Sequence, residues 1–407
     1  MSRSVALRPY ALAVVLGGAM ALFSVAFLFV AFHLQELLFD TIPGHLDLSQ
    51  RWWIVIVCSV GGLVVGLLNT VGGRQRGEAH DVEESIADAH QAAQGDPGPT
   101  DGVFMARVGL GVASLGFGGA RGPDAPRIAY VSTLGARLGA LLKMAKDESV
   151  QLSVAAALGG LFGTPLSVAA TVDVDESGSV TGGKLSKIGP TLVAALTGLI
   201  VLRQVLPDDV LQPFVAAVGD AASRFGTGLV WAGMAAAAAA LVARAALTTL
   251  APARSLVVRH VPGGPVAHGL LGGVVLGLGG FVTPLALFSG HHETQELLLD
   301  AHTRSTWSLL GLAGLKLVVL VVVLATGWFG GQIFPVGFAG ATLALALGHA
   351  LGVGSEISLV AAGFTAAAAV LIRRPIMTFL LLLIFFPPDA WPTMALATIA
   401  ATIVLAA

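Results

Sequence analysis

Apolar stretches follow one another along nearly the whole chain, and several of them are too short to cross a membrane. The run 11–32 carries no charged residue, whereas the runs 103–118 and 375–386 are shorter than the roughly 20 residues that a spanning helix needs. A short helix that ends at membrane depth must have its free backbone groups buried in protein or facing a water-filled cavity. The pattern therefore predicts an all-α integral membrane protein with broken and re-entrant helices.

The balance of apolar and charged residues also favours a lipid environment. Hydrophobic residues make up 55% of the 407 and charged residues only 11%, compared with about 25% charged residues in soluble domains. We expect one transmembrane domain over residues 1–407. The run 11–32 should remain as a helix, because it exceeds the roughly 7–15 apolar residues of a secretory signal. The net charge of −2 argues against nucleic-acid binding, and the single cysteine, Cys58, excludes an intrachain disulfide.

Two segments in opposite halves of the chain carry the same glycine and proline pattern. In each, a proline stands four residues after the second glycine of a pair, and a further proline, Pro165 or Pro375, follows after 42 or 40 residues. The first segment, which we call the first break, is Gly118, Gly119, Ala120, Arg121, Gly122 and Pro123, and the second break is Gly330, Gly331, Gln332, Ile333, Phe334 and Pro335. The matched spacing indicates an internal repeat, with approximate halves 50–205 and 225–390.

The two breaks could bind an anion if helices begin there. A helix N-terminus has free N–H groups and about half a positive charge, so it attracts an anion. Glycine lets the backbone approach an ion closely, and proline in the first turn loses no useful hydrogen bond. Paired breaks in two halves of a membrane chain point to a substrate site. The alternative is that both are ordinary kinks in packed helices, although kinks need not recur at matched spacing.

Four blocks of the sequence together resemble the CLC family of chloride channels and chloride–proton antiporters. Lys316 and the GGQIFP stretch of the second break look like the family's lysine-bearing helix, glycine-rich break and GxFxP motif. The first break stands where the family has GREGP. The stretches 161–166 and 361–376 resemble the small-residue helices and prolines that follow each motif. The blocks keep the family's order and spacing over roughly residues 50–390.

The resemblance implies a fold, a path and an assembly. It implies a CLC-like inverted repeat and a homodimer in which each subunit moves chloride or a similar small anion through its own path. Backbone amides around Gln332, Ile333 and Phe334, and those after Gly119, would line that path near the middle of the bilayer. It further implies a multi-pass protein of the bacterial plasma membrane. We expect no cofactor and no metal site, because the histidines and acids within residues 291–302 lack HExxH spacing and fall on different helix faces.

The chain departs from the family at the gate. The glutamate of GREGP, which couples chloride to protons in the family, is replaced by Arg121, and an arginine remains a cation. The nearest acid is Asp124, about one helical turn further on. Asp124 could be a displaced gate, or a charge that stabilises the helix N-terminus. Asp175 falls where proton-coupled members have an internal glutamate, but its acidic neighbours favour a solvated turn.

Three other features remain open. The family's third anion-binding loop corresponds to the segment with Gly77 and His80, which lacks the serine and the proline of that loop. This segment could line the path or form an interfacial turn. Lys316 lies in an apolar stretch, where it could make the path more positive or could extend toward the membrane surface. The family's tyrosine beside the central ion has no counterpart, since Tyr10 and Tyr130 both come early.

Passive anion conduction is the function that these observations favour. Proton-coupled exchange of chloride or fluoride with Asp124 as the gate is the alternative, and a paralogue that no longer transports is a third possibility. We expect no enzyme, because neither HExxH nor GxSxG occurs in the sequence.

Overall fold

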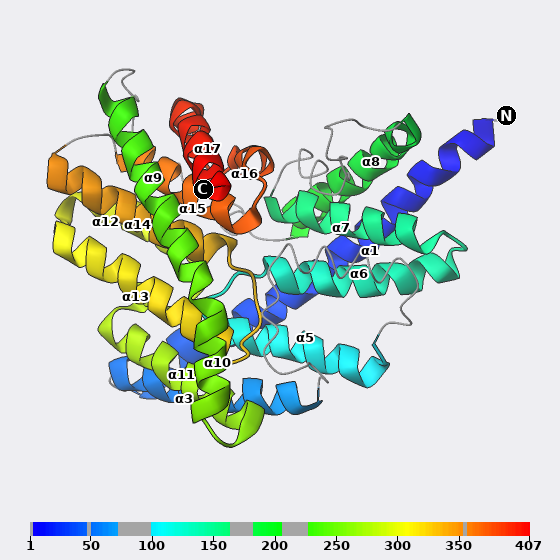
Figure 1. Ribbon diagram of the computed structural model, residues 1–407. Coiled ribbons are helices and arrows are strands. Elements are labelled where there is room, and N and C mark those ends of the chain that lie inside the picture. Colours follow the sequence, from blue (N-terminus) through cyan, green and yellow to red (C-terminus); the bar gives the residue numbers. More distant parts are fainter. Residues whose placement is uncertain (1–2, 47–49, 72–98, 163–181, 206–226, 353–355) are drawn as a thin grey trace.

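The computed structural model describes residues 3–46, 50–71, 99–162, 182–205, 227–352 and 356–407, and these residues are almost entirely helical (Figure 1). The helices of the first half are α1 (Arg3–Glu36), α2 (Ile42–Leu46), α3 (Gln50–Val71), α5 (Asp101–Gly116), α6 (Asp124–Leu141), α7 (Lys146–Phe162) and α8 (Gly182–Val205). A π-helical turn, Leu37–Thr41, joins α1 to α2.

The second half of the chain continues the pattern of long helices separated by short pieces. Its helices are α9 (Thr227–Thr248), α10 (Leu250–His260), α11 (Gly264–Val282), α12 (His291–Asp300), α13 (Thr306–Ala325), α14 (Ile333–Leu351), α15 (Glu356–Ile372), α16 (Pro375–Leu382) and α17 (Trp391–Ala406). Three single 3-10 turns, Pro284–Ala286, Ala301–Thr303 and Pro388–Ala390, lie between them. The described residues contain no regular strand, only one isolated bridge.

The helices are those of a multi-pass membrane protein. Eight spans among the described residues are long and apolar enough to cross a bilayer, and one of them includes the expected N-terminal helix. Large apolar side chains point outward from several helices, with Phe29 64% and Trp307 82% exposed. Such side chains suit lipid rather than water as the surrounding solvent. The prediction of an all-α integral membrane fold is confirmed.

Close helix packing depends on glycine. α3 packs along α11, and a Cβ added at Gly62 would lie 2.4 Å from the carbonyl oxygen of Gly269. α14 packs along α15 in the same way, because a Cβ at Gly340 would lie 2.5 Å from the carbonyl oxygen of Gly363. Small residues let membrane helices approach until their backbones touch.

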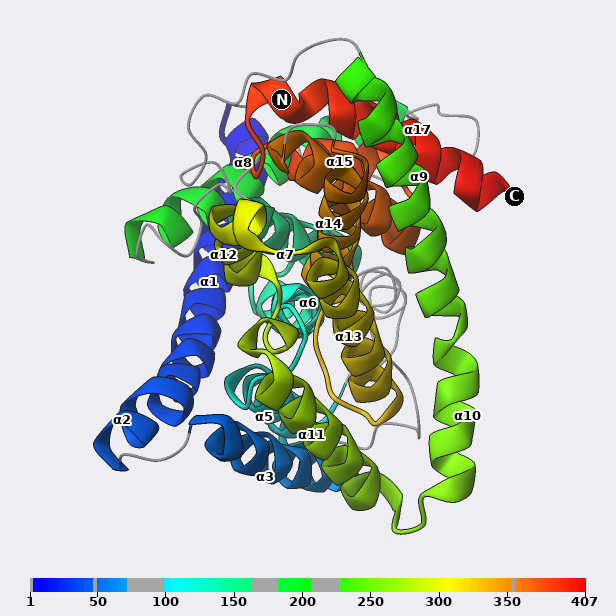
Figure 2. The same cartoon turned by 90° about the vertical axis from the view of Figure 1, so that its left-hand side faces the viewer.

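The core of the second half is formed around α15. Every residue from Ile357 to Ile372 is buried, and the helix packs against α9, α14 and α17. In Figure 2 the central helices α6 and α14 lie between α1 on one side and α9 and α10 on the other. α6 begins directly after the first break, and α14 begins within the second break. The fold therefore brings both breaks into the interior.

Candidate anion pathway

The two breaks meet each other in the interior of the protein. The backbone N–H of Gly122 donates to the carbonyl oxygen of Gly331 at 2.8 Å, and the N–H of Gly331 donates to the carbonyl oxygen of Gly122 at 2.7 Å. This pair forms the isolated antiparallel bridge of the described structure. Two segments that the sequence related only by their spacing are thus joined by backbone hydrogen bonds. We call this contact the junction.

Both helices that leave the junction begin without a side-chain cap. α6 begins at Asp124 after Pro123, and α14 begins at Ile333 after Gln332; neither capping residue makes a side-chain hydrogen bond to its helix. The first turn of a helix has N–H groups with no partner inside the helix. The positive ends of two helices therefore lie close to the junction, an arrangement that attracts an anion.

Arg121, at the family's gate position, is fully buried and spans the junction. Its Nε donates to the carbonyl oxygen of Gly330 at 2.8 Å, and its Nη2 donates to the same oxygen. A Cβ added at Gly330 would lie 2.6 Å from the Cβ of Arg121. The arginine that replaces the glutamate thus connects the two breaks through a charged hydrogen bond, a stronger type than one between neutral groups.

Asp124 lies against both glycines of the junction. Its side chain is fully buried, and its carboxylate atoms lie 1.8–2.0 Å from the place where a Cβ of Gly331 would stand. A Cβ at Gly122 would lie 2.2 Å from Oδ1 of the same carboxylate. Only glycine at both positions leaves room for the acid. The sequence placed Asp124 at the start of α6, whereas its contact with the second break becomes visible only in the fold.

Arg127 is a buried cation that the sequence reasoning did not single out. It lies one turn after Asp124 on α6, and only 1% of its surface is exposed. Its guanidinium nitrogens Nε, Nη1 and Nη2 have no hydrogen-bond partner among the described residues. A charge beside an apolar stretch of a membrane protein is a functional signal. Arg127, which directly precedes the apolar residues after the first break, could therefore have been selected from sequence.

A cavity of about 270 Å³ reaches the junction from the side of α1 and α12. Arg121 and Arg127 line it together with Phe334 from the first turn of α14. Glu36 at the end of α1 also lines it; its side chain is 67% exposed and pairs with His33 at 3.5 Å. The lining of the cavity therefore includes this exposed acid and two buried arginines.

α12 contributes three ionisable side chains to the same cavity, those of His291, His292 and Glu293. This helix lies outside the eight candidate spans. Burial, together with the neighbouring His292, lowers the pKa of His291 to about 3, so His291 is neutral at physiological pH. Glu293 accepts a hydrogen bond from the backbone N–H of Gly290 at 2.7 Å, which caps the start of α12. Arg121 and Arg127 are thus the buried cations among the residues that line the cavity.

Lys316 holds the loop that supports the first break. Its Nζ donates to the carbonyl oxygens of Leu285, Leu287 and Phe288 and lies 5.2 Å from the ring centre of Phe338. The N–H of Phe288 in turn donates to the carbonyl oxygen of Gly118 at 3.1 Å. Lys316 is fully buried and does not line the cavity. The interpretation that Lys316 extends to the membrane surface is therefore wrong. Its contribution to a positive potential along the path stays a prediction.

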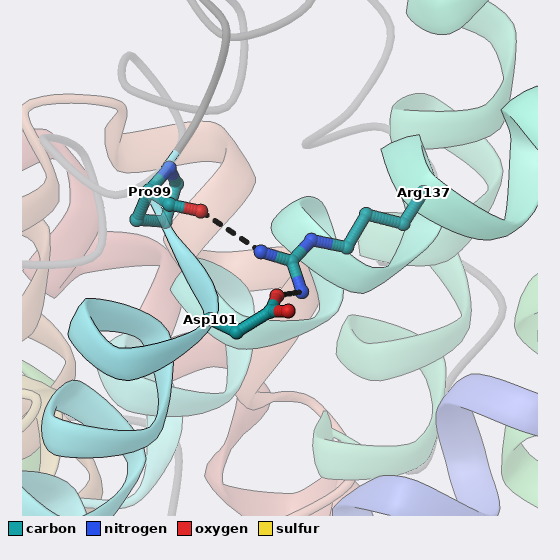
Figure 3. Close-up of polar contacts among 3 residues, drawn as sticks. All are labelled: Pro99, Asp101 and Arg137. Atoms are coloured by element: carbon teal, nitrogen blue, oxygen red, sulfur yellow. Dashed lines mark hydrogen bonds and ion pairs between the residues drawn. The ribbon is translucent and has the colours of Figure 1, made fainter.

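The far end of α6 is anchored at the protein surface. Figure 3 shows Arg137 between Asp101 and Pro99: its Nη1 pairs with Asp101 Oδ1 at 2.7 Å, and its Nη2 donates to the Pro99 carbonyl oxygen at 2.8 Å. The guanidinium also lies over the ring of Phe104. Because the Asp101 side chain is 91% exposed, this ion pair contributes at most about 1 kcal/mol.

Three of the residues proposed from sequence cannot be placed. Asp175, Gly77 and His80 lie outside the described residues, so the internal acid and the third loop remain predictions. The described residues contain no group of three or more His, Cys, Asp or Glu side chains that could hold a metal ion.

The helical fold and the junction of two helix N-termini define a membrane protein suited to carrying anions. The sequence model described as "Voltage gated chloride channel" matches residues 75–406. The chain therefore belongs to the voltage-gated chloride channel family, CLC, as the resemblance predicted.

Relatives and solved structures agree with this assignment. The chain is 30% identical to the "Putative ion-transport protein YfeO" of Escherichia coli (strain 55989 / EAEC) over 367 residues, which cover 88% of this chain and 82% of the relative. The protein of the same name from Escherichia fergusonii is 29% identical over the same shares. A slow cyanobacterial Cl−/H+ antiporter has a similar structure, with a TM-score of 0.80 at 15% identity, covering 98% of this chain and 94% of that one. A CLC-type fluoride/proton antiporter also has a similar structure, with a TM-score of 0.75 at 16% identity. The match covers 99% of this chain and 96% of the antiporter chain.

Proposed function

We propose that the protein conducts small inorganic anions, chloride in particular, passively through the junction of the two breaks. The proposal includes a homodimer in the bacterial plasma membrane, with one path in each subunit. The family is one of anion transporters, and the observation that carries the passive mode is Arg121. Its buried guanidinium bonds the Gly330 carbonyl oxygen at the position where the family has a titrating acid.

An arginine at this position removes the usual means of coupling to protons. A gating acid works because its ionised form imitates an anion and its neutral form leaves the site. A guanidinium stays charged at every accessible pH and carries the opposite sign. Moving Arg121 out would also break the hydrogen bonds that connect the breaks. Passive flow of anions past a fixed positive group is the behaviour that this arrangement supports.

Proton-coupled exchange is a second candidate because of Asp124. Its carboxylate lies against the glycines of both breaks, where an acid that changed charge could affect an anion at either helix end. Structurally similar proteins are described as Cl−/H+ and fluoride/proton antiporters. Against this role, the N-terminus of α6 and the nearby guanidinium of Arg127 both attract the charged carboxylate and so oppose its neutralisation.

Chloride efflux from proteoliposomes, measured with a pH electrode at fixed membrane potential, separates these candidates. We expect chloride flux without stoichiometric proton movement. The variant Asp124→Asn, which keeps the shape and removes the charge, should retain a saturated chloride rate within about threefold, equivalent to less than 1 kcal/mol. Coupled proton uptake that disappears in Asp124→Asn would establish exchange instead. The absence of any anion flux in folded protein would favour the non-transporting paralogue.

A further inference from the structure

Two buried arginines line the same cavity, but they differ in how their charge is used. Arg121 donates to the Gly330 carbonyl oxygen from two of its nitrogens. Arg127, with 1% exposure, has no hydrogen bond from any guanidinium nitrogen within the described part of the chain. A buried charge without hydrogen bonds is costly unless another group satisfies it. The cavity that Arg127 lines is therefore the place where such a group would bind.

The nearest carboxylate does not satisfy Arg127. Asp124 acts on it electrostatically from one helical turn away, but its oxygens are directed at Gly122 and Gly331, and no hydrogen bond joins the two side chains. The two acids that line the cavity, Glu36 and Glu293, are engaged elsewhere. Glu293 accepts from the Gly290 N–H, and the exposed Glu36 pairs with His33. The donors of Arg127 are left for a ligand that enters the cavity.

The size and walls of the cavity indicate what kind of anion this is. Its volume of about 270 Å³ is several times the roughly 30 Å³ that a water molecule occupies in the liquid, so it accommodates more than a single halide ion. Four phenyl rings line it, those of Phe32, Phe288, Phe334 and Phe385. Apolar walls with a few convergent polar groups are typical of sites for small organic ligands.

The geometry of the guanidinium group indicates more closely which chemical class of anion Arg127 binds. The planar fork of arginine matches the two oxygens of a carboxylate, with two parallel N–H···O bonds, whereas a spherical halide uses only its charge. A carboxylate bound to Arg127 would leave its alkyl group to the phenyl rings. Arg127 and the rings thus complement the two ends of a short aliphatic acid.

We infer that Arg127 and the surrounding phenyl rings form a binding site for small monocarboxylates of the acetate and propionate type, within the anion path. The inference rests on the proposed pathway and extends it from inorganic anions to short organic ones. It makes Arg127 a residue that determines specificity, in contrast to Arg121, which connects the breaks.

Binding of chloride, formate, acetate and propionate to the purified detergent-solubilised protein tests this site, by calorimetry and by the shift in melting temperature. We expect each carboxylate to bind more tightly than chloride. Affinity should rise about fourfold for each methylene group buried against the rings, until the cavity is filled. Equal binding of chloride and all the carboxylates by the wild type would overturn the inference.

Variants of Arg127 show whether its positive charge or the planar shape of its guanidinium causes the preference for carboxylates. Arg127→Lys keeps the positive charge and loses the fork, so the ratio of acetate to chloride affinity should fall about tenfold or more. Arg127→Met should abolish the preference. Arg137→Met, on the exposed end of the same helix, is the matched control and should keep the wild-type ratio. If Arg127→Lys kept the wild-type ratio of acetate to chloride affinity, Arg127 would not be the residue that binds the carboxylate. If neither Arg127 variant folds, the binding series of chloride, formate, acetate and propionate on the wild type tests the inference.

The experiments test the carboxylate site and the proposed anion pathway independently of each other. Acetate binding by a folded protein that shows no anion flux in liposomes would contradict the proposed function and leave the Arg127 site in place. Chloride flux by a protein that binds carboxylates no more tightly than chloride would support the proposed pathway and contradict the carboxylate site at Arg127.

Discussion

Replacing Gly331 by alanine is expected to reduce anion flux at least about tenfold, which corresponds to roughly 1.4 kcal/mol or more in the transport barrier. The added methyl group would stand 1.8–2.0 Å from three carboxylate atoms of Asp124. Two atoms that are not bonded to each other cannot stay so close. Asp124 is fully buried, so it cannot turn out to solvent. The carboxylate or the junction must move, and either movement changes the path.

A second substitution identifies the cause of this loss. Asp124→Ala removes the colliding carboxylate, so the double variant Gly331→Ala with Asp124→Ala should recover much of the flux that Gly331→Ala loses. Residues in direct contact give strongly non-additive effects of this kind. Gly314→Ala in α13 is the control, because a Cβ there meets nothing within 4 Å. Unchanged flux in Gly331→Ala would remove the second break from the pathway, and a double variant without recovery would exclude Asp124 as the obstacle.

Lys316→Met is expected to give the largest loss of stability among single substitutions outside the path, on the order of 3 kcal/mol. The methionine fills a similar volume but leaves the carbonyl oxygens of Leu285, Leu287 and Phe288 without their donor. Buried carbonyl groups that lose their hydrogen bonds carry the full desolvation cost. Loosening this loop also weakens the bond from Phe288 to Gly118, so flux should fall as well.

Unfolding by denaturing detergent in mixed micelles measures the effect of Lys316→Met. Lys143→Met provides the matched control, since Lys143 is exposed at the end of α6 and undergoes the same chemical change. Equal stability of the wild type and Lys316→Met would contradict the structural role assigned to Lys316.

The outline of the site could be predicted from sequence because it depends on local signals. Glycine and proline mark where α6 and α14 begin, and the replacement of the gate acid by Arg121 is visible in the motif itself. The motif blocks also predicted the family, which the match over residues 75–406 confirms. Helix starts and family motifs are properties of short segments, so the linear sequence is enough to locate them.

Contacts between distant segments could not be predicted in the same way. The carboxylate of Asp124 touches Gly331, far along the chain, and nothing in either motif indicates this contact. The hydrogen bonds of Lys316 could not be predicted for the same reason: its apolar neighbours are visible in the sequence, whereas the loop carbonyl oxygens that bind it are not. Arg127 was overlooked although a charge beside an apolar stretch is a recognisable signal.

The central claim is that an anion passes between the N-termini of α6 and α14, at the bridge between Gly122 and Gly331. Anomalous diffraction from crystals of the wild-type protein grown in bromide tests it most directly, because bromide replaces chloride and its position can be assigned without ambiguity. The account predicts a bromide peak beside this bridge, within reach of the first-turn amides of α14. Bromide bound elsewhere in the protein, with no peak at the junction, would contradict it.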